Sequence, residues 1–421
     1  MRGWTMAEDG KTDRDQRDLH SDELGRDQID RIRAALPVLR RAVYLNAGTA
    51  GPVPARAVAA MQKAAQEELT TPRTGESYFR AAAERADSIR RRIAALLGAD
   101  ADEITLTAGT TEGVNIAAWA LRWQPGDEIV SANTEHPGGL FPLFALRERF
   151  GLTLRLADLM EPPADVVAAL SALMTRRTRL IVLSHVAWST GERYPIEAVA
   201  ELAHAHGALL LVDGAQGAGA APLHLGTSGV DFYALPGQKW LLGPEGTGAL
   251  YVRAARLPEL LNTYAGYESA ASWNRSAGFL PHPTARRFEV GSRHPVALAG
   301  QEAALAWLQE EVGLERAIAR IRRLAARLRE QLAEVPGVRV LTPAAHAGLV
   351  AFQIGGITPS EAVARLGKEG YLVRWIDAPA AVRASCGFYN TEEEIDAFAA
   401  AVARLAEKAA GQPRPGARST S

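Results

Sequence analysis

The chain lacks the features that define several large classes of protein. It has a single cysteine, Cys386, among 421 residues, which excludes an intrachain disulfide framework and is typical of a reducing compartment. No run reaches the 18 or more apolar residues of a membrane span, and the charged start MRGWTMAEDGKTDRDQRD contains no apolar signal-peptide core. We therefore expect a cytoplasmic protein without a membrane partner.

The chain also lacks an excess of either charge. Lys and Arg number 47 and Asp and Glu number 48, so no global field attracts nucleic acid or an anionic membrane. No G-x-G-x-x-G motif follows a strand pattern and opens a helix, which argues against a nicotinamide enzyme. His204 and His206 have no further ligand cluster nearby, which argues against a metal centre. A small-molecule substrate fits this composition best.

The hydrophobic pattern predicts two domains. Helical periodicity at 77–97 and 196–206 alternates with short apolar strands at 181–184 and 208–213, an order that predicts a mostly parallel sheet covered on both faces. After about residue 295, long helical patterns precede strand-like segments and two further helices, which is an α+β arrangement. The expected organisation is disordered ends at 1–23 and 410–421, a segment at 24–53 that packs on the small domain, a large domain at 54–292 and a small domain at 293–409.

Polar residues follow three of the predicted strands, and ligands in open α/β sheets bind beyond the carboxyl ends of the strands. Gly109, Thr110 and Thr111 open a helix, and N–H groups at a helix start bind phosphate. Asp213 follows five apolar residues, where a carboxylate can hold a cationic ring nitrogen. Lys239 lies between two strand-like runs, where desolvation favours the neutral amine that Schiff-base formation needs.

Each of these patterns also has a simpler explanation. The threonines are also suited to an N-cap without a ligand, and Asp213 to an Asx-turn. Most lysines, moreover, are solvated surface residues. Together, however, a phosphate cradle, an acid for a ring nitrogen and an imine-forming lysine, in this order, are the parts that hold pyridoxal 5′-phosphate (PLP).

The motifs around these residues resemble those of a known family. They are TAGTTEGVN, TEHPGG, SHVAWSTG, VDGAQ, PGQKWLLGPEGTGALYV, RRFEVGS and VRASCGFYNTEEEID. In this order they are similar to those of the class V aminotransferase family of fold type I PLP enzymes, which includes cysteine desulfurases, C–S lyases and isopenicillin N epimerase. The resemblance runs from YLNAGTAGPVP at 44–54 to the last predicted helix. It implies an α/β fold, with a large domain whose mostly parallel mixed sheet is flanked by helices, plus a smaller α+β C-terminal domain.

The resemblance also implies roles for individual residues around the cofactor ring. Lys239 would form the Schiff base with PLP and then move the substrate's α-proton. Asp213 would keep the pyridine nitrogen protonated, and Gln216 would hydrogen-bond the 3′-oxygen of the ring. His136 would lie on the ring face, although a lone histidine is more often a helix cap.

Further roles concern phosphate and substrate. The phosphate would be bound by Gly109, Thr110, Thr111 and Gln238, and by Ser292 from a partner subunit, which implies a homodimer with active sites at the subunit interface. Arg383 would bind the substrate carboxylate through its two-pronged guanidinium. Arg374, nine residues earlier, would reach the same pocket, although either arginine is equally suited to a surface ion pair.

The chain departs from the family pattern at three positions. Pro236 stands where Ser or Thr is common, so one phosphate contact is expected to be lost because proline offers no donor. Gln238 replaces a common histidine. Trp188 stands where cysteine desulfurases usually have Asn, which predicts an apolar wall beside the substrate.

The most informative departure is a missing cysteine. Desulfurases carry a nucleophilic cysteine on a mobile loop before the last arginine, whereas only WIDAPAAV separates Arg374 from Arg383. Cys386 follows in a strand-like segment and is expected to pack in the core. The missing cysteine thus argues against a desulfurase. The short link between the two arginines, Trp188 and the GPEGTG turn after Lys239 together resemble the cysteine/cystine C–S lyase branch of the family. This resemblance implies a lyase that cleaves a cysteine-derived amino acid by β-elimination. An aminotransferase or an epimerase remains as an alternative, because both need the same cofactor residues. A non-catalytic dimeric scaffold is disfavoured because Lys239, Asp213 and Gln216 are all retained.

Overall fold

The computed structural model describes residues 24–160 and 165–411. The predicted disordered ends therefore lie outside the described residues, apart from residues 410 and 411. The last helix reaches Ala410.

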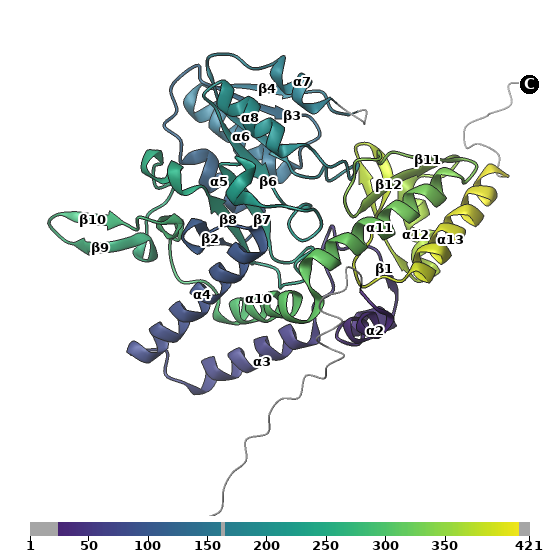
Figure 1. The fold of residues 1–421 in the computed structure, drawn as a ribbon, viewed down its shortest axis with the longest axis horizontal. Coiled ribbons are helices and arrows are strands. Elements are labelled where there is room, and N and C mark those ends of the chain that lie inside the picture. Colours follow the sequence, from purple (N-terminus) through teal and green to yellow (C-terminus); the bar gives the residue numbers. More distant parts are fainter. Residues whose placement is uncertain (1–23, 161–164, 412–421) are drawn as a thin grey trace, which may run out of the picture.

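A seven-stranded sheet forms the centre of the large domain (Figure 1). Its strands, in spatial order, are β2 (Ile104–Thr107), β8 (Gly248–Val252), β7 (Phe232–Pro236), β6 (Leu209–Asp213), β5 (Thr178–Ser184), β3 (Glu128–Ala132) and β4 (Thr153–Ala157). β8 is antiparallel to β2 and β7, and the other neighbours are parallel. The predicted mostly parallel mixed sheet is confirmed.

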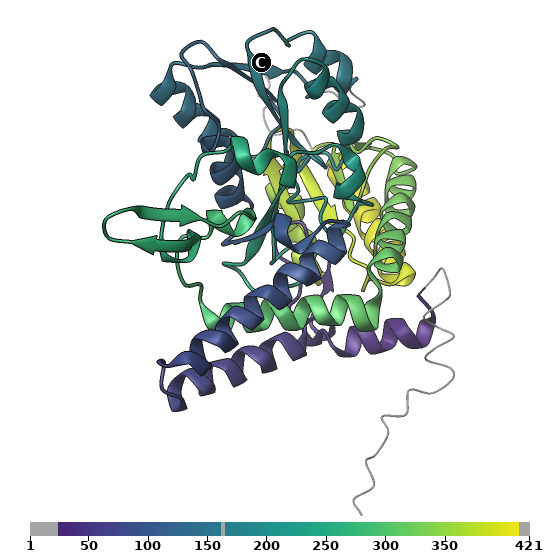
Figure 2. The same ribbon diagram turned by 60° about the vertical axis from the view of Figure 1, so that its left-hand side comes forward.

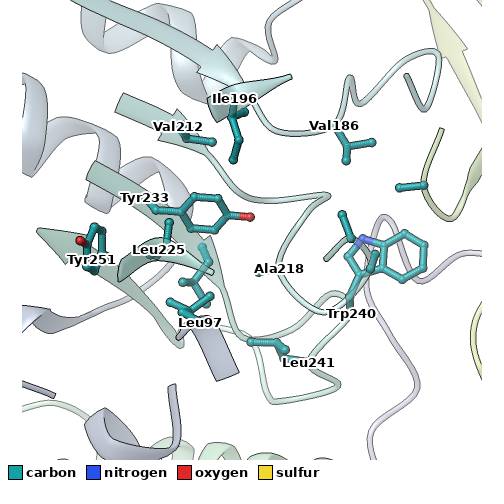
Figure 3. Packing of buried hydrophobic residues seen from close by; sticks show 14 of the residues in the cluster. Leu97, Val186, Ile196, Val212, Ala218, Leu225, Tyr233, Trp240, Leu241 and Tyr251 are labelled. Carbon is teal, nitrogen blue, oxygen red and sulfur yellow. The ribbon is translucent and has the colours of Figure 1, made fainter. Parts of the chain in front are cut away.

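Both faces of this sheet are covered, because alternate residues of each strand join different hydrophobic clusters. Leu210 and Val212 of β6 pack in one cluster, whereas Leu211 between them packs in the other. Figure 3 shows the first cluster, in which Tyr233 of β7 lies near Val212 and Leu225. Strands that are buried on both faces explain the nearly continuous apolar runs in the sequence.

The helices of the large domain lie on these two faces and at one end of the sheet. They are α3 (Ala55–Thr70), α4 (Glu76–Leu97), α5 (Thr110–Trp119), α6 (Pro137–Phe150), α7 (Val166–Ser171), α8 (Ile196–Ala205) and α9 (Leu225–Ser228). The next helix, α10 (Pro295–Trp307), packs mainly against α3 and α4 (Figure 2). The domain boundary near residue 292 stays a prediction, and the contacts of α10 favour a position after this helix.

The C-terminal part contains a second sheet with its own hydrophobic cluster. The strands, in spatial order, are β11 (Val338–Val340), β12 (Leu349–Ile354), β15 (Ala380–Ser385) and β14 (Arg374–Asp377). They pack with α11 (Leu314–Ala333), α12 (Pro359–Lys368) and α13 (Glu392–Ala410). Apart from Leu45, the buried residues of this cluster come from Leu324 onward.

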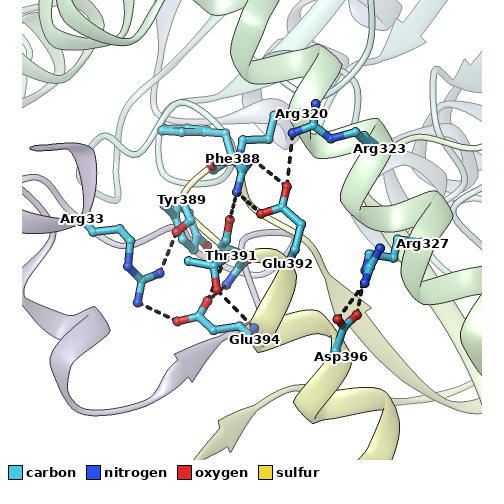
Figure 4. A network of polar contacts seen from close by, with 11 residues as sticks. Arg33, Arg320, Arg323, Arg327, Phe388, Tyr389, Thr391, Glu392, Glu394 and Asp396 are labelled. Atoms are coloured by element: carbon cyan, nitrogen blue, oxygen red, sulfur yellow. Dashed lines mark hydrogen bonds and ion pairs between the residues drawn. The ribbon is translucent and has the colours of Figure 1, made fainter. Parts of the chain in front are cut away.

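The N-terminal segment connects the two parts. β1 (Val43–Tyr44) pairs in parallel with β13 (Tyr371–Leu372). Arg33 of α2 (Arg26–Ala34) donates hydrogen bonds to the carbonyl of Tyr389 and to the carboxylate of Glu394 (Figure 4). These contacts fix the chain that leads into residues 46–54.

A two-stranded hairpin projects from the large domain in both ribbon views. It consists of β9 (Ala270–Asn274) and β10 (Gly278–Pro281) and exposes Trp273, Phe279 and Leu280. Exposed aromatic residues that gather on one projecting element mark a surface suited to contact with another protein.

Candidate active site

Most of the predicted site residues meet in one pocket at the carboxyl ends of β5 to β7. The pocket has a volume of about 500 Å³. Its lining includes Gly109, Thr110, Thr111, His136, Trp188, Asp213, Gln216, Gln238, Lys239, Arg374 and Arg383. Ser292 is exposed and does not line the pocket within the single chain. A larger hollow of about 810 Å³ beside α4 and α11 is lined by none of these residues.

Lys239 lies in the connection between antiparallel strands β7 and β8, as the sequence predicted. The loop is held from the N-terminal segment, because the backbone N–H of Gly51 donates to the carbonyl of Gln238 at 2.7 Å. Among the described residues, the Lys239 amine has no hydrogen-bond or ion-pair partner. Burial lowers its pKa to about 8, while Asp213 opposes this shift and the two pocket arginines add to it. The amine is therefore neutral in a substantial fraction of molecules near neutral pH.

Asp213 ends β6 and is 5% exposed. Its Oδ1 accepts a hydrogen bond from the backbone N–H of Ala215 at 2.8 Å, while no partner is present for Oδ2 among the described residues. Burial raises the pKa of Asp213, and the charge of Lys239 counteracts this effect. A buried carboxylate with one free oxygen is suited to binding a cationic N–H group.

The side chain of Gln216, three residues after Asp213, is held by two hydrogen bonds. Its Nε2 donates to the carbonyl of Gly48 at 2.8 Å, and its Oε1 accepts from the indole of Trp240 at 2.9 Å. Figure 3 shows this indole as part of the first hydrophobic cluster. One hydrogen of the amide group remains for a ligand.

His136 and Trp188 form an aromatic wall of the pocket. His136 is the N-cap of α6, where its Nδ1 accepts from the N–H of Gly138 at 3.0 Å. Its ring meets the Trp188 indole edge to face, with centroids 5.2 Å apart. Burial, together with the positive charges of the pocket, lowers the pKa of His136 to about 4. The ring is thus a neutral imidazole that can pack on a flat aromatic ligand.

The two arginines enter the pocket from the small domain. Arg374 on β14 and Arg383 on β15 are directly paired across the antiparallel strands. Arg383 is 1% exposed and donates to the carbonyl of Trp188 at 2.9 Å and to the hydroxyl of Thr49 at 3.1 Å. No carboxylate of the described residues forms an ion pair with either guanidinium. Two cationic groups without an internal counter-ion make this end of the pocket suited to an anionic substrate group.

The start of α5 forms another part of the pocket lining. Gly109 is the N-cap residue, with Thr110 and Thr111 in the first turn. The Thr110 hydroxyl and the Gln238 side-chain oxygen are buried, and neither has a hydrogen-bond partner in the part of the chain that the structure describes. Buried polar groups are nearly always hydrogen-bonded, so these atoms indicate a polar ligand. A helix start, hydroxyl groups, a carboxylate, an aromatic wall and an amine together fit PLP.

Three residues of the N-terminal segment contribute to the site without having been singled out in the sequence. Gly48 binds Gln216, Thr49 binds Arg383 and Gly51 binds the Lys239 loop. In the sequence these residues are marked only by the glycine-rich segment AGTAGP, which shows neither strand nor helix periodicity. Glu135 was also missed, because it is hidden within TEHPGG next to His136.

Within the described residues, no group of three or more His, Cys, Asp or Glu side chains is arranged to hold a metal ion. In the same parts of the chain, no helix combines the length and apolarity that crossing a membrane requires.

Comparison with known proteins places this fold and pocket among PLP enzymes. A mutant of the protein C-DES with glycine covalently linked to PLP superimposes with a TM-score of 0.83 at 30% identity, covering 88% of this chain and 98% of that one. The cystine C–S lyase C-DES in complex with cysteine persulfide gives a TM-score of 0.84 at 30% identity, covering 87% and 99%. The protein is therefore a PLP-dependent enzyme of fold type I.

The sequence comparisons narrow this class to a family. The model of the aminotransferase class-V family matches residues 43–398. A cysteine desulfurase of Escherichia coli O139:H28 is 30% identical over 399 residues, covering 90% of this chain and 98% of its own. A probable cysteine desulfurase of Mycolicibacterium paratuberculosis is 33% identical over 337 residues, which are 76% of this chain but 49% of that protein. The chain belongs to the class V aminotransferase family, as the motifs predicted.

Proposed function

We propose that the protein is a C–S lyase that cleaves a cysteine-derived amino acid by β-elimination and releases pyruvate, ammonia and a sulfur product. When bound, PLP supplies an electron sink for the charge that is left on the substrate Cα. The solved structure of the cystine C–S lyase C-DES, at 30% identity, supports this choice within the family.

Each lining residue has a proposed part in this reaction. The Lys239 amine would hold the cofactor and then move the α-proton, a task suited to a pKa of about 8. Asp213 Oδ2 would keep the ring nitrogen protonated, and the Gln216 amide would bind the 3′-oxygen. His136 would cover the ring face and, with Trp188, exclude water from it.

The remaining lining residues would bind the substrate carboxylates and the phosphate group of the cofactor. Arg383 would hold the substrate carboxylate, and Arg374 would take a second carboxylate of a substrate such as cystine. Gly109, Thr110 and Thr111 would hold the phosphate. Pro236 offers no donor there, but the unpartnered Gln238 amide could replace the missing contact after rotation of its O and N atoms.

The observation that carries this proposal is the position of the only cysteine. Cys386 follows β15, is 0% exposed and packs in the hydrophobic cluster of the small domain. Burial raises the pKa of its thiol to about 12, so the thiol stays protonated. The relatives named cysteine desulfurases make a desulfurase the second candidate, but no cysteine of this chain lines the pocket.

A homodimer in the cytoplasm is the proposed working form. Ser292 is exposed rather than in the pocket of its own chain, which is compatible with donation to a partner subunit. The exposed apolar side chains of the hairpin, and of Phe141 and Tyr267 on the large domain, would be covered in such a dimer.

The test combines absorbance spectra with a pyruvate assay. The purified protein, Lys239→Ala and the control Lys63→Ala, an exposed lysine of α3, are supplied with PLP and then with cysteine, cystine or a cysteine sulfoxide. Before the amino acid is added, we expect a protein-bound visible cofactor band for wild type and Lys63→Ala but not for Lys239→Ala. After it is added, we expect pyruvate release without a keto acid for the first two proteins and none for Lys239→Ala. A band without pyruvate would move the assignment to an aminotransferase or epimerase.

A further inference from the structure

Glu135 is a buried carboxyl group that the reaction described above does not use. It lies between β3 and α6 and is 4% exposed. Its Oε1 accepts the backbone N–H of Ser184 at 2.9 Å, and its Oε2 is 2.7 Å from the Ser184 hydroxyl. Ser184 ends β5, which lies between β3 and β6 in the sheet. Glu135, just after β3, and Asp213, at the end of β6, thus lie at the carboxyl ends of two strands that are separated only by β5.

The two carboxyl groups face the same point of the α6 backbone. A side-chain Cβ on Gly139 would lie 3.6 Å from Oδ2 of Asp213 and 3.9 Å from Oε2 of Glu135. Neither carboxyl group forms an ion pair with a Lys, Arg or His of the described residues. Two carboxylates in one buried space without such a cation cannot both ionise at low cost.

The other groups around the pair determine which carboxyl keeps the proton. Asp213 accepts a hydrogen bond from the Ala215 N–H, and the positive charge of the Lys239 amine attracts its carboxylate. Both interactions favour the ionised form of Asp213. On the Glu135 side, the titratable neighbour besides Asp213 is the Tyr194 hydroxyl, which contacts the Thr134 hydroxyl at 3.3 Å. Burial and the charge of Asp213 raise the pKa of Glu135 to about 8.

The hydrogen bonds of Glu135 allow it to be protonated. The Ser184 hydroxyl can rotate, so that it donates to an ionised Glu135 or accepts from a protonated one. The backbone N–H of Ser184 donates to the other oxygen in either state. No buried group loses its partner when the proton is present.

We propose that Glu135 keeps a proton at neutral pH, so that the pair carries one negative charge, located on Asp213, and that Glu135 is thereby a positioning residue for the cofactor. That the negative charge of Asp213 faces the ring nitrogen of PLP rests on the proposed function. The protonation of Glu135 does not rest on it. If Glu135 were instead the ionised member of the pair, its charge would raise the pKa of Asp213 further, and the single proton would lie on Asp213. The ring nitrogen would then lose its anionic partner.

The first experiment measures urea unfolding of the holoenzyme between pH 5.5 and 8 for wild type and Glu135→Gln. In unfolded chains Glu135 ionises near its ordinary pKa, whereas the folded form keeps its proton up to about pH 8. Wild type should therefore lose stability relative to Glu135→Gln as the pH rises. The ratio of their unfolding constants should grow by up to tenfold per pH unit. A ratio that is constant over this range would overturn the proposal.

A matched control is Glu128→Gln on β3. Glu128 is also buried, but it is paired with Arg155 at 2.9 Å, and this hydrogen bond lowers its pKa. It is ionised in both folded and unfolded chains above pH 5.5. Its unfolding ratio should therefore stay constant between pH 5.5 and 8, which separates the protonation of Glu135 from a general effect of buried glutamates.

The second experiment measures the dissociation constant of PLP and the absorbance spectrum at pH 7. Glutamine is uncharged and keeps an acceptor for the Ser184 N–H, so Glu135→Gln should bind PLP as wild type does. Glu135→Ala, which removes both contacts with Ser184, should bind more weakly. A well-folded Glu135→Gln protein with at least tenfold weaker PLP binding would overturn the positioning role. Neither readout requires lyase activity, so failure of the proposed function would be recognised separately.

Discussion

Burial shifts the pKa values of two titratable side chains, Cys386 and Lys239, in opposite directions. It raises the pKa of the Cys386 thiol to about 12 and lowers the pKa of the Lys239 amine to about 8. In both cases the charged form is disfavoured, because a buried ion loses its hydration. The consequence is an unreactive thiol in the small domain and a nucleophilic amine in the pocket.

Cys386→Ala tests the first of these statements. We expect unchanged pyruvate formation and a free energy of unfolding lower by about 1 kcal/mol, since only a small buried side chain is truncated. Urea unfolding and the steady-state rate are the measurements. Loss of activity in a protein that remains folded and binds PLP would indicate cysteine chemistry instead.

The pH dependence of cofactor attachment tests the second statement. Only the neutral amine of Lys239 attacks an aldehyde, and burial lowers its pKa from the ordinary value of 10.5 to about 8. The rate at which the apoprotein attaches PLP should therefore rise with pH and level off above about pH 8. Stopped-flow absorbance would show this, and a rate that still rises steeply at pH 10 would contradict it.

Asp213 and Lys239 could be recognised in the sequence because the first directly follows an apolar strand and the second lies between two apolar strands. Asp213 ends β6, and Lys239 lies between β7 and β8. Glu135 could not be recognised, since its significance depends on Ser184 and Asp213, which are 49 and 78 residues away in the sequence. Local patterns carry no information about such distant neighbours.

At the scale of elements, the loop that carries Lys239 is shaped by a second segment of chain. Residues 46–51 pass from β1 to α3 across the pocket, and the Gly51 N–H binds the loop at Gln238. A Cβ on Gly51 would overlap the carbonyl oxygen of Lys239 and the side chain of Leu242. Leu242 itself has a φ of 55°, a conformation unusual for a residue with a Cβ.

Gly51→Ala should therefore displace the Lys239 loop. We expect a loss of about 1–3 kcal/mol in the free energy of unfolding from this overpacking, together with weaker PLP binding. Gly367→Ala is the control, because a Cβ there meets no atom within 4 Å and lies in helix α12. It should leave PLP binding unchanged and stabilise the protein by up to about 1 kcal/mol. Equal PLP affinity in both variants would show that the contact at Gly51 does not position the loop.

At the scale of the whole molecule, the pocket is built from three parts of the chain. The large sheet supplies Asp213 and Lys239, the small domain supplies Arg374 and Arg383, and the N-terminal segment joins them through Thr49. Ser292 is the predicted site residue that is left outside. The proposed homodimer would complete the site.

Mixed dimers test this arrangement. Ser292→Asp should repel the phosphate, and Lys239→Ala removes the amine, so each variant alone should be inactive. If Ser292 acts across the interface, one site of a mixed dimer combines an intact Lys239 with an intact Ser292, and activity returns after the two variants are unfolded and refolded together. If Ser292 acts within its own subunit, the mixture shows no such recovery, and if Ser292 takes no part in the site, Ser292→Asp alone is active.

The sequence by itself determined the class of fold, the cofactor family and most of the pocket residues. It could do so because strand and helix periods are local, and because Asp213 and Lys239 stand out as polar residues next to apolar strands. The remaining pocket residues were implied by the resemblance of the ordered motifs to the class V aminotransferase family. Only the tertiary structure decided the order of the strands, which places Glu135 beside Asp213, and the path of the N-terminal segment against the Lys239 loop. Both depend on contacts between residues far apart in the chain, which are selected by the packing of the whole molecule and not by any local pattern.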